Sequence, residues 1–286
     1  MISFFKKRLG QIRYVKRPSQ VYRFLFSKVK SIELAITFVC NFKCQGCYAE
    51  DLKTATPTML SKEEVLGFLK KYKPMHVNIT RGEPLTHPNL YEIIQETPKS
   101  VVVSMVTNGS LLNEEKINKL KNAGLNTIQI SFGKNYPWDN LEKAKLAKRA
   151  GLNVCLSVTN THKNKKHILA AIEAAEENDY HVLWNLPSDS LVKDFDRETY
   201  FKYRSHPRIR EDNMFWAGKN RCPAGREKIY ITAKGELTPC DRWHKVYPDL
   251  ETMRKEFKNK ERVWCNRLGD IHKKEEVTEI KKGYCN

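Results

Sequence analysis

Three cysteines, Cys40, Cys44 and Cys47, lie within eight residues. Thiolates are the usual ligands of iron–sulfur clusters, and a [4Fe–4S] cluster has four irons to ligate. Three thiolates therefore leave one iron open to bind and activate a small molecule. A structural zinc ion would require a fourth ligand, and no nearby residue is an obvious candidate. A zinc knuckle or a chance grouping of thiols is the alternative interpretation.

A second motif, Thr80-Arg81-Gly82-Glu83-Pro84, follows an apolar segment that we interpret as a strand. Alone, this sequence is an ordinary signal for a strand that ends in a turn. Its position is more specific, because it comes one strand–helix unit after the three cysteines. Parallel sheets bind their ligands beyond the carboxyl ends of their strands, so both motifs are expected at the same edge.

The two motifs resemble those of the radical S-adenosylmethionine superfamily, over about residues 32–187. The match covers Cys40, Cys44, Cys47 and the aromatic Tyr48 that follows them. The resemblance implies a [4Fe–4S] cluster whose open iron is chelated by the amino and carboxylate groups of S-adenosylmethionine. An electron from the cluster then breaks the S–C5′ bond, and the 5′-deoxyadenosyl radical abstracts a hydrogen atom.

The second motif looks like the family's Gly-Gly-Glu-Pro, which holds the amino group of the bound methionine through backbone carbonyls and the acidic side chain. Gly82, Glu83 and Pro84 match it. Arg81 replaces the first glycine, which raises the question of how closely the backbone can approach the ligand there.

Two weaker matches follow. Asn108, in Thr107-Asn108-Gly109, ends a third expected strand, where the family often has this tripeptide. Ser131 ends a fourth, where a hydroxyl often binds the ribose. We expect both to contact the cofactor, with turn chemistry as the alternative.

A second group of cysteines lies in the last 65 residues, at Cys222, Cys240, Cys265 and Cys285. The spacing of Cys222 and Cys240, with a hairpin between them at about 228–240, resembles the auxiliary-cluster modules called SPASM and twitch. The resemblance implies a second, auxiliary [4Fe–4S] cluster with these four ligands. Zinc would be satisfied by the same thiolates, and three ligands plus one free thiol is a further variant.

Cys155 stands apart in the middle of an expected strand. It is interpreted as a small buried hydrophobic residue. The alternative is a thiol that points into the barrel and returns a hydrogen atom to a substrate radical.

The elements that must position these residues alternate between strand and helix, which predicts a parallel sheet with right-handed crossovers. We expect an α/β fold, a partial (β/α)6 TIM-like barrel with a small C-terminal hairpin and helix module stapled by iron and sulfur. The expected strands are Ile32–Phe38, Met75–Thr80, Val101–Thr107, Thr127–Phe132, Val154–Thr159 and His181–Leu186. Expected helices start at a Ser61 capping box, at Asn113, near Leu141 and at Lys165, the last ending at Asn178.

This pattern divides the chain into four parts. A basic amphipathic arm spans 1–31, the barrel 32–190, an irregular basic connecting segment 191–221, and the auxiliary module 222–286. Arg204 and the run from His206 to Arg210 in the connecting segment either clamp a phosphate or are solvated.

The net charge of +18 favours anionic partners, and residues 1–32 contain nine Lys or Arg and no acidic residue. Residues 1–30 are therefore expected either to contact an anionic membrane peripherally or to pack on the barrel. No apolar run is long enough to span a membrane and no secretory signal is evident, which predicts a cytoplasmic protein.

These features favour a radical S-adenosylmethionine oxidoreductase or epimerase that dehydrogenates or epimerises an anionic sugar-, nucleotide- or lipid-linked metabolite. A flavodoxin or ferredoxin is the expected reducing partner. Modification of a ribosomally made peptide is the alternative substrate prediction. A zinc-stapled basic nucleic-acid-binding protein is the rival of another class; we expect no nucleic acid, since that reading leaves both N-terminal motifs unexplained.

Overall fold

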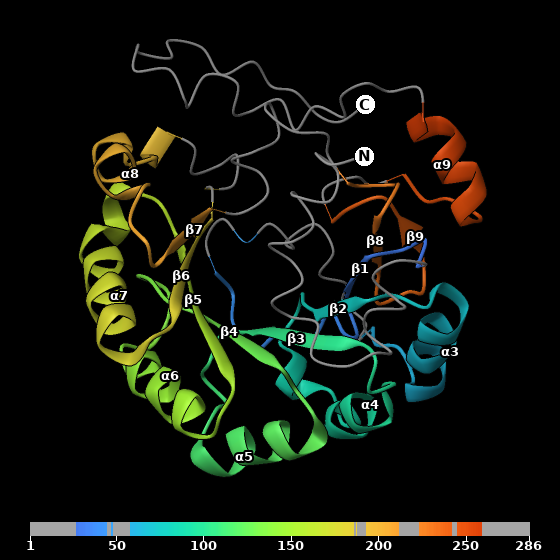
Figure 1. Cartoon of the computed structure of the whole chain (residues 1–286), viewed down its shortest axis with the longest axis horizontal. Coiled ribbons are helices and arrows are strands. Elements are labelled where there is room, and N and C mark those ends of the chain that lie inside the picture. Colours follow the sequence, from blue (N-terminus) through green and yellow to red (C-terminus); the bar gives the residue numbers. More distant parts are fainter. Residues whose placement is uncertain are drawn as a thin grey trace, which may run out of the picture.

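The computed structural model of the chain describes residues 27–44, 47, 58–185, 187, 193–211, 223–241 and 245–258. Within them, one curved sheet is wrapped on its outer side by helices (Figure 1). This arrangement is the expected partial α/β barrel.

Nine strands form this sheet, in the order β7-β6-β5-β4-β3-β2-β1-β8-β9. All neighbouring pairs are parallel except β8 and β9, which form an antiparallel hairpin. The strands are β1 (Ser31–Leu34), β2 (His76–Ile79), β3 (Val102–Thr107), β4 (Thr127–Ser131), β5 (Asn153–Thr159), β6 (His181–Asn185), β7 (Ile209–Glu211), β8 (Lys228–Ile231) and β9 (Leu237–Thr238).

The described helices include the four expected from the sequence. They are α3 (Lys62–Tyr72), α4 (Leu90–Glu96), α5 (Glu114–Ala123), α6 (Asn140–Arg149), α7 (Lys165–Asn178), α8 (Arg197–Tyr203) and α9 (Leu250–Lys258), with short 3₁₀ helices η2 (Pro84–Thr86) and η3 (His162–Asn164). The capping box is confirmed, because Ser61 and Glu64 each accept a hydrogen bond from the other's backbone amide. Gly124 ends α5 in the left-handed conformation that its lack of a Cβ permits.

The two faces of the sheet differ in chemistry. Residues that face the helices, such as Val77 and Ile79 on β2, are almost fully buried and form the main core. Many residues that face the barrel interior are polar, although Val106 is also among the residues that line the pocket there. Among the polar ones, Asn78 donates to Glu33 at 2.7 Å and accepts from Ser104 at 2.8 Å. Much of the barrel interior is therefore a polar, hydrogen-bonding surface, in contrast to the apolar core between the sheet and the helices.

The expectation of an irregular connecting segment at 191–221 is wrong for its described part. Helix α8 buries Tyr200 completely, and β7 adds a seventh parallel strand beside β6. A three-residue strand is too short to show an alternating pattern, which is why the sequence did not reveal it. Arg208 pairs with Asp179, so this arginine is used within the fold.

The C-terminal hairpin is present, but it is not separate from the barrel. Strand β8 pairs in parallel with β1, from Ser31 opposite Lys228 to Leu34 opposite Ile231. In α9, Met253 is fully buried in the main core cluster. Residues 223–241 and 245–258 thus extend the barrel's sheet and share its core, so the described part of the expected module is continuous with the barrel.

Among the described residues, no helix is long and apolar enough to cross a membrane. Residues 1–26 of the predicted basic arm, with its predicted membrane contact, lie outside the described residues.

Candidate active site

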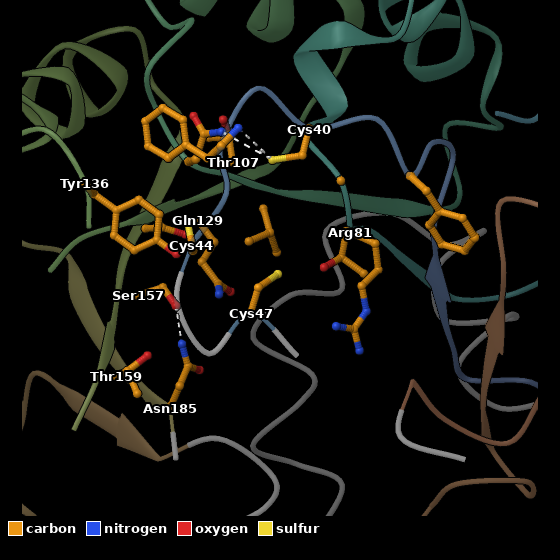
Figure 2. A pocket seen from close by; sticks show the side chains of 17 residues that line it. Cys40, Cys44, Cys47, Arg81, Thr107, Gln129, Tyr136, Ser157, Thr159 and Asn185 are labelled. Carbon is orange, nitrogen blue, oxygen red and sulfur yellow. Dashed lines mark hydrogen bonds between the residues drawn. The ribbon is translucent and has the colours of Figure 1, made fainter. Parts of the chain in front are cut away.

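The three clustered cysteines line one pocket, beyond the carboxyl end of β1 (Figure 2). The backbone amide of Phe42 donates to the Cys40 sulfur at 3.4 Å, and the Asn108 side-chain amide reaches the same sulfur at 4.0 Å. Hydrogen bonds of this kind stabilise negative charge on sulfur. Tyr48 lies outside the described residues.

Three thiolates in one pocket are a donor set that suits an iron–sulfur cluster. Among the described residues, no three Cys, His, Asp or Glu side chains converge closely enough to hold one ion. In a cubane each thiolate binds its own iron, so the three sulfurs need not converge. The described residues that line the pocket include no His, Asp or Glu that would complete a fourth position.

Gly82 is packed too closely against another loop to carry a side chain. A Cβ on Gly82 would lie 2.5 Å from the Val39 carbonyl oxygen and 2.6 Å from that of Thr37. The close approach of the two loops therefore occurs at the second position of the motif, where glycine is kept. Arg81 also has a positive φ of 71°, and its side chain pairs with Asp241, with 2.5 Å between Nη2 and Oδ2.

Glu83 lies beneath the loop, fully buried, and is not among the pocket's lining residues. Its carboxylate accepts hydrogen bonds from the Thr107 hydroxyl at 2.7 Å, the Asn108 amide at 2.7 Å and the Leu85 amide at 3.2 Å. Burial raises the pKa of Glu83, and these donors oppose that rise. The contacts show a side chain that ties the β2 and β3 loops together. Pro84 begins η2 directly after it.

Asn108 and Ser131 both line the pocket, as the sequence predicts for neighbouring strand ends. The sequence reasoning missed Asn140, which holds them in place. Its buried side-chain amide donates to the Asn108 carbonyl at 2.9 Å and to the Ser131 carbonyl at 2.8 Å. No sequence pattern marked this asparagine, because its partners are backbone atoms of other segments.

A neutral polar wall on β4 to β6 faces the cysteines, and the sequence reasoning missed it too. It consists of Gln129, Ser157, Thr159 and Asn185, all labelled in Figure 2. Asn185 donates to the Ser157 hydroxyl at 2.6 Å. The available signal was polar residues at alternate strand positions, which in a barrel face the interior.

Two stacked aromatic rings also line the pocket, and one of them belongs to the cysteine segment. Phe42 stacks on Tyr136, from the loop after β4, with 6.2 Å between ring centroids. Both side chains line the pocket, so the rings contribute an apolar surface beside the polar wall.

Cys155 lies on β5, opposite Gln129 on β4 and His181 on β6. It has the same strand parity as Ser157 and Thr159, so it faces the barrel interior below them. Burial raises the pKa of this thiol to about 12, so it stays protonated at neutral pH. An S–H group is retained there, although Cys155 does not line the pocket.

Of the second cysteine group, Cys240 is described, at the end of the β8–β9 hairpin. Cys222, Cys265 and Cys285 lie outside the described residues. The hairpin places Cys240 next to Asp241, the partner of Arg81.

The Radical SAM superfamily model matches residues 34–187, more than half of the chain. The chain belongs to the radical SAM superfamily. A radical SAM enzyme uses a [4Fe–4S] cluster and S-adenosylmethionine, the cofactors that the two N-terminal motifs predict.

Curated relatives match over part of their length. A probable GTP 3′,8-cyclase of Methanococcus maripaludis is 32% identical over 110 residues, covering 37% of each chain. One of Methanococcus aeolicus is 32% identical over 157 residues, 51% of this chain and 47% of that protein. The chain thus matches about a third to a half of these relatives' length.

Solved structures share the fold. SuiB of Streptococcus suis, bound to S-adenosylmethionine, aligns with a TM-score of 0.63 at 15% identity, over 87% of this chain and 75% of that one. A structure titled anSMEcpe with bound AdoMet aligns with a TM-score of 0.55 at 15% identity, over 80% of each. At 15% sequence identity, these structures show the shared fold and do not indicate the substrate of this chain.

Proposed function

We propose that this radical SAM enzyme abstracts a hydrogen atom from a polyhydroxylated, sugar- or nucleotide-type substrate held against the neutral wall, leading to oxidation or epimerisation. One observation carries the proposal. The pocket that gathers Cys40, Cys44 and Cys47 is closed on its far side by hydroxyl and carboxamide groups instead of apolar side chains.

In this proposal Cys40, Cys44 and Cys47 hold a [4Fe–4S] cluster. When bound, the cluster supplies the electron that cleaves S-adenosylmethionine. Gly82 lets its loop pack closely on the segment that precedes Cys40, while the Glu83 side chain fixes the loop from below. Asn108, Ser131 and Tyr48 position the nucleoside end.

The substrate class rests on the wall and on the relatives. Ser157, Thr159 and Asn185 donate and accept hydrogen bonds without a net charge, which suits hydroxyl groups. The curated relatives are named GTP 3′,8-cyclases, which supports a substrate with a nucleotide part. The charge of +18 supports an anionic group elsewhere on the substrate and an acidic reductant such as a flavodoxin or ferredoxin.

Cys155 is proposed as the hydrogen donor if the outcome is epimerisation. It keeps its proton at neutral pH and lies one residue pair below Ser157 on the same face. A second cluster held by Cys222, Cys240, Cys265 and Cys285 would accept an electron if the outcome is oxidation.

The test is metal analysis combined with product analysis under anaerobic conditions. The reconstituted chain should contain close to eight irons, and dithionite with S-adenosylmethionine should yield 5′-deoxyadenosine. Replacing Cys40, Cys44 and Cys47 by Ala should abolish that product and leave about half of the iron. Zinc in place of iron, or turnover that survives the triple substitution, would overturn the proposal.

The wall is tested with deuterated substrates. Nucleoside diphosphate sugars and free nucleotides, deuterated on the sugar, should transfer deuterium to 5′-deoxyadenosine, and Asn185→Leu should lower this transfer at least tenfold. Equal transfer by wild type and Asn185→Leu would contradict the role of the wall. Transfer from a deuterated peptide instead would favour the alternative substrate class.

A further inference from the structure

Arg81 has a backbone conformation that the fold must hold in place. Three described non-glycine residues have positive φ: Lys73, Arg81 and Asp179. Lys73 and Asp179 end helices α3 and α7, where the left-handed conformation is usual. Arg81 lies in the loop after β2 and ends no helix, so its conformation requires another cause.

The side chain of Arg81 supplies that cause. It is 1% exposed, and its Nη2 atom contacts both the Asp241 carboxylate at 2.5 Å and the Asp241 carbonyl oxygen at 3.1 Å. The guanidinium also lies 5.8 Å from the ring centre of Tyr230 on β8. One arginine thus joins the loop after β2 to the hairpin of β8 and β9, across 160 residues of sequence.

The Arg81 end of this ion pair is buried, whereas the Asp241 side chain is 27% exposed. Moving the two loops apart would leave the Arg81 charge in a poorly hydrated environment, at a high cost in free energy. The two loops are therefore expected to move as one unit.

Each end of the pair adjoins a candidate cluster ligand. On one side, Gly82 packs against Val39, the residue before Cys40, and Arg81 itself lines the pocket. On the other side, Asp241 directly follows Cys240.

We infer that Arg81 and Asp241 form a positioning pair that couples the S-adenosylmethionine pocket to the Cys240 site. The inference rests on the proposed function for the role of Cys240. It assigns a role to Arg81, which stands where the family motif has its first glycine. Glycine has no side chain and could not form this ion pair. Because coupling between two sites is reciprocal, S-adenosylmethionine binding should alter the second cluster, and loss of that cluster should weaken S-adenosylmethionine binding.

The test uses Arg81→Gly, Arg81→Lys and Asp241→Asn in the full chain. Glycine adopts a φ of 71° without strain. Any loss of S-adenosylmethionine binding or of coupling in Arg81→Gly therefore comes from the missing side chain. Arg208→Ala is the matched control, because Arg208 makes an ion pair of the same 2.5 Å length with Asp179 at an exposed site.

With reconstituted protein, the electron paramagnetic resonance signal of the second cluster should shift when S-adenosylmethionine is added. Arg81→Gly and Asp241→Asn should abolish this shift and raise the Kd for S-adenosylmethionine about tenfold. Arg81→Lys should keep part of the shift and part of the affinity for S-adenosylmethionine. Arg208→Ala should keep the full shift and the wild-type affinity. An unchanged shift and Kd in Arg81→Gly would overturn the inference.

A metal-free readout separates this inference from the proposed function. In the apoprotein, amide hydrogen exchange at 237–241 should accelerate in Arg81→Gly and stay unchanged in Arg208→Ala. If the wild type lacks a second cluster, the proposed role of Cys240 fails while this tether still stands. Unchanged exchange in Arg81→Gly would refute the tether itself.

Discussion

Glu83 and Cys155 show how burial changes what a single side chain can do. Glu83 is a carboxylate from an expected ligand motif, but its oxygens accept three hydrogen bonds from neighbouring loops. Its contacts make it a support for the residues that line the pocket. Cys155 has the opposite character, because burial keeps its sulfur protonated and so preserves a removable hydrogen atom.

The raised pKa of Cys155 predicts a specific loss of stability in alkali. The unfolded chain ionises this thiol near pH 9, whereas the folded chain resists ionisation to about 12. Its contribution to stability is therefore intact below pH 9 and is lost as the pH rises toward 12. Between pH 8 and 10.5, wild-type apoprotein should lose about 2 kcal/mol more than Cys155→Ala.

Urea denaturation of both proteins at the two pH values measures this difference. The other cysteines are present in both proteins and cancel in the comparison. Parallel losses in wild type and Cys155→Ala would show that the thiol ionises as readily in the folded chain as in the unfolded one.

At the scale of elements, backbone atoms hold together the loops at the carboxyl ends of β1 and β2, and the Glu83 side chain ties in the loop after β3. The Glu83 amide donates to the Val39 carbonyl at 2.7 Å, and Gly82 packs against the same segment. This geometry leaves no space for a Cβ at position 82, although it accommodates a large side chain at position 81.

Two glycine substitutions test this packing. Gly82→Ala should lower the unfolding free energy by about 2 kcal/mol or more, because the Cβ meets two carbonyl oxygens at a positive φ of 50°. Gly67→Ala in α3 is the control, since nothing lies within 4 Å of its added Cβ. It should stabilise the chain by about 0.5–1 kcal/mol, because alanine favours helix.

Both changes are read from urea denaturation of the apoprotein. If Gly82→Ala were as stable as wild type, the two loops would not be in the close contact that we describe.

At the scale of the whole molecule, the sheet continues from β1 into β8. Ile231 on β8 is fully buried in the same core as the strands of the barrel. The C-terminal hairpin therefore protects an edge of the barrel and carries Cys240 and Asp241 toward the pocket.

Ile231→Asp tests whether this segment and the barrel unfold together. A buried unpaired carboxylate should destabilise the apoprotein by about 4 kcal/mol or more. Amide exchange should accelerate in β1 and β2 as well as in β8. Val246→Asp, at a residue 48% exposed in the same segment, should change stability by less than about 0.5 kcal/mol. Acceleration confined to residues 223–258 would instead indicate an independent module.

The sequence determined the family and most of the barrel. Helix α7 has the predicted bounds Lys165–Asn178, and the six predicted strands are present as β1 to β6, because local caps and apolar periodicity encode such elements. The family motifs were equally local, since Cys40, Cys44 and Cys47 are close in sequence.

Tertiary structure alone decided the pairing of β8 with β1, the presence of β7, the polar wall from Gln129 to Asn185, and the bond between Arg81 and Asp241. Each of these depends on which strands become neighbours and which face of a strand points inward. Those are properties of long-range packing, and no short stretch of this chain contains them.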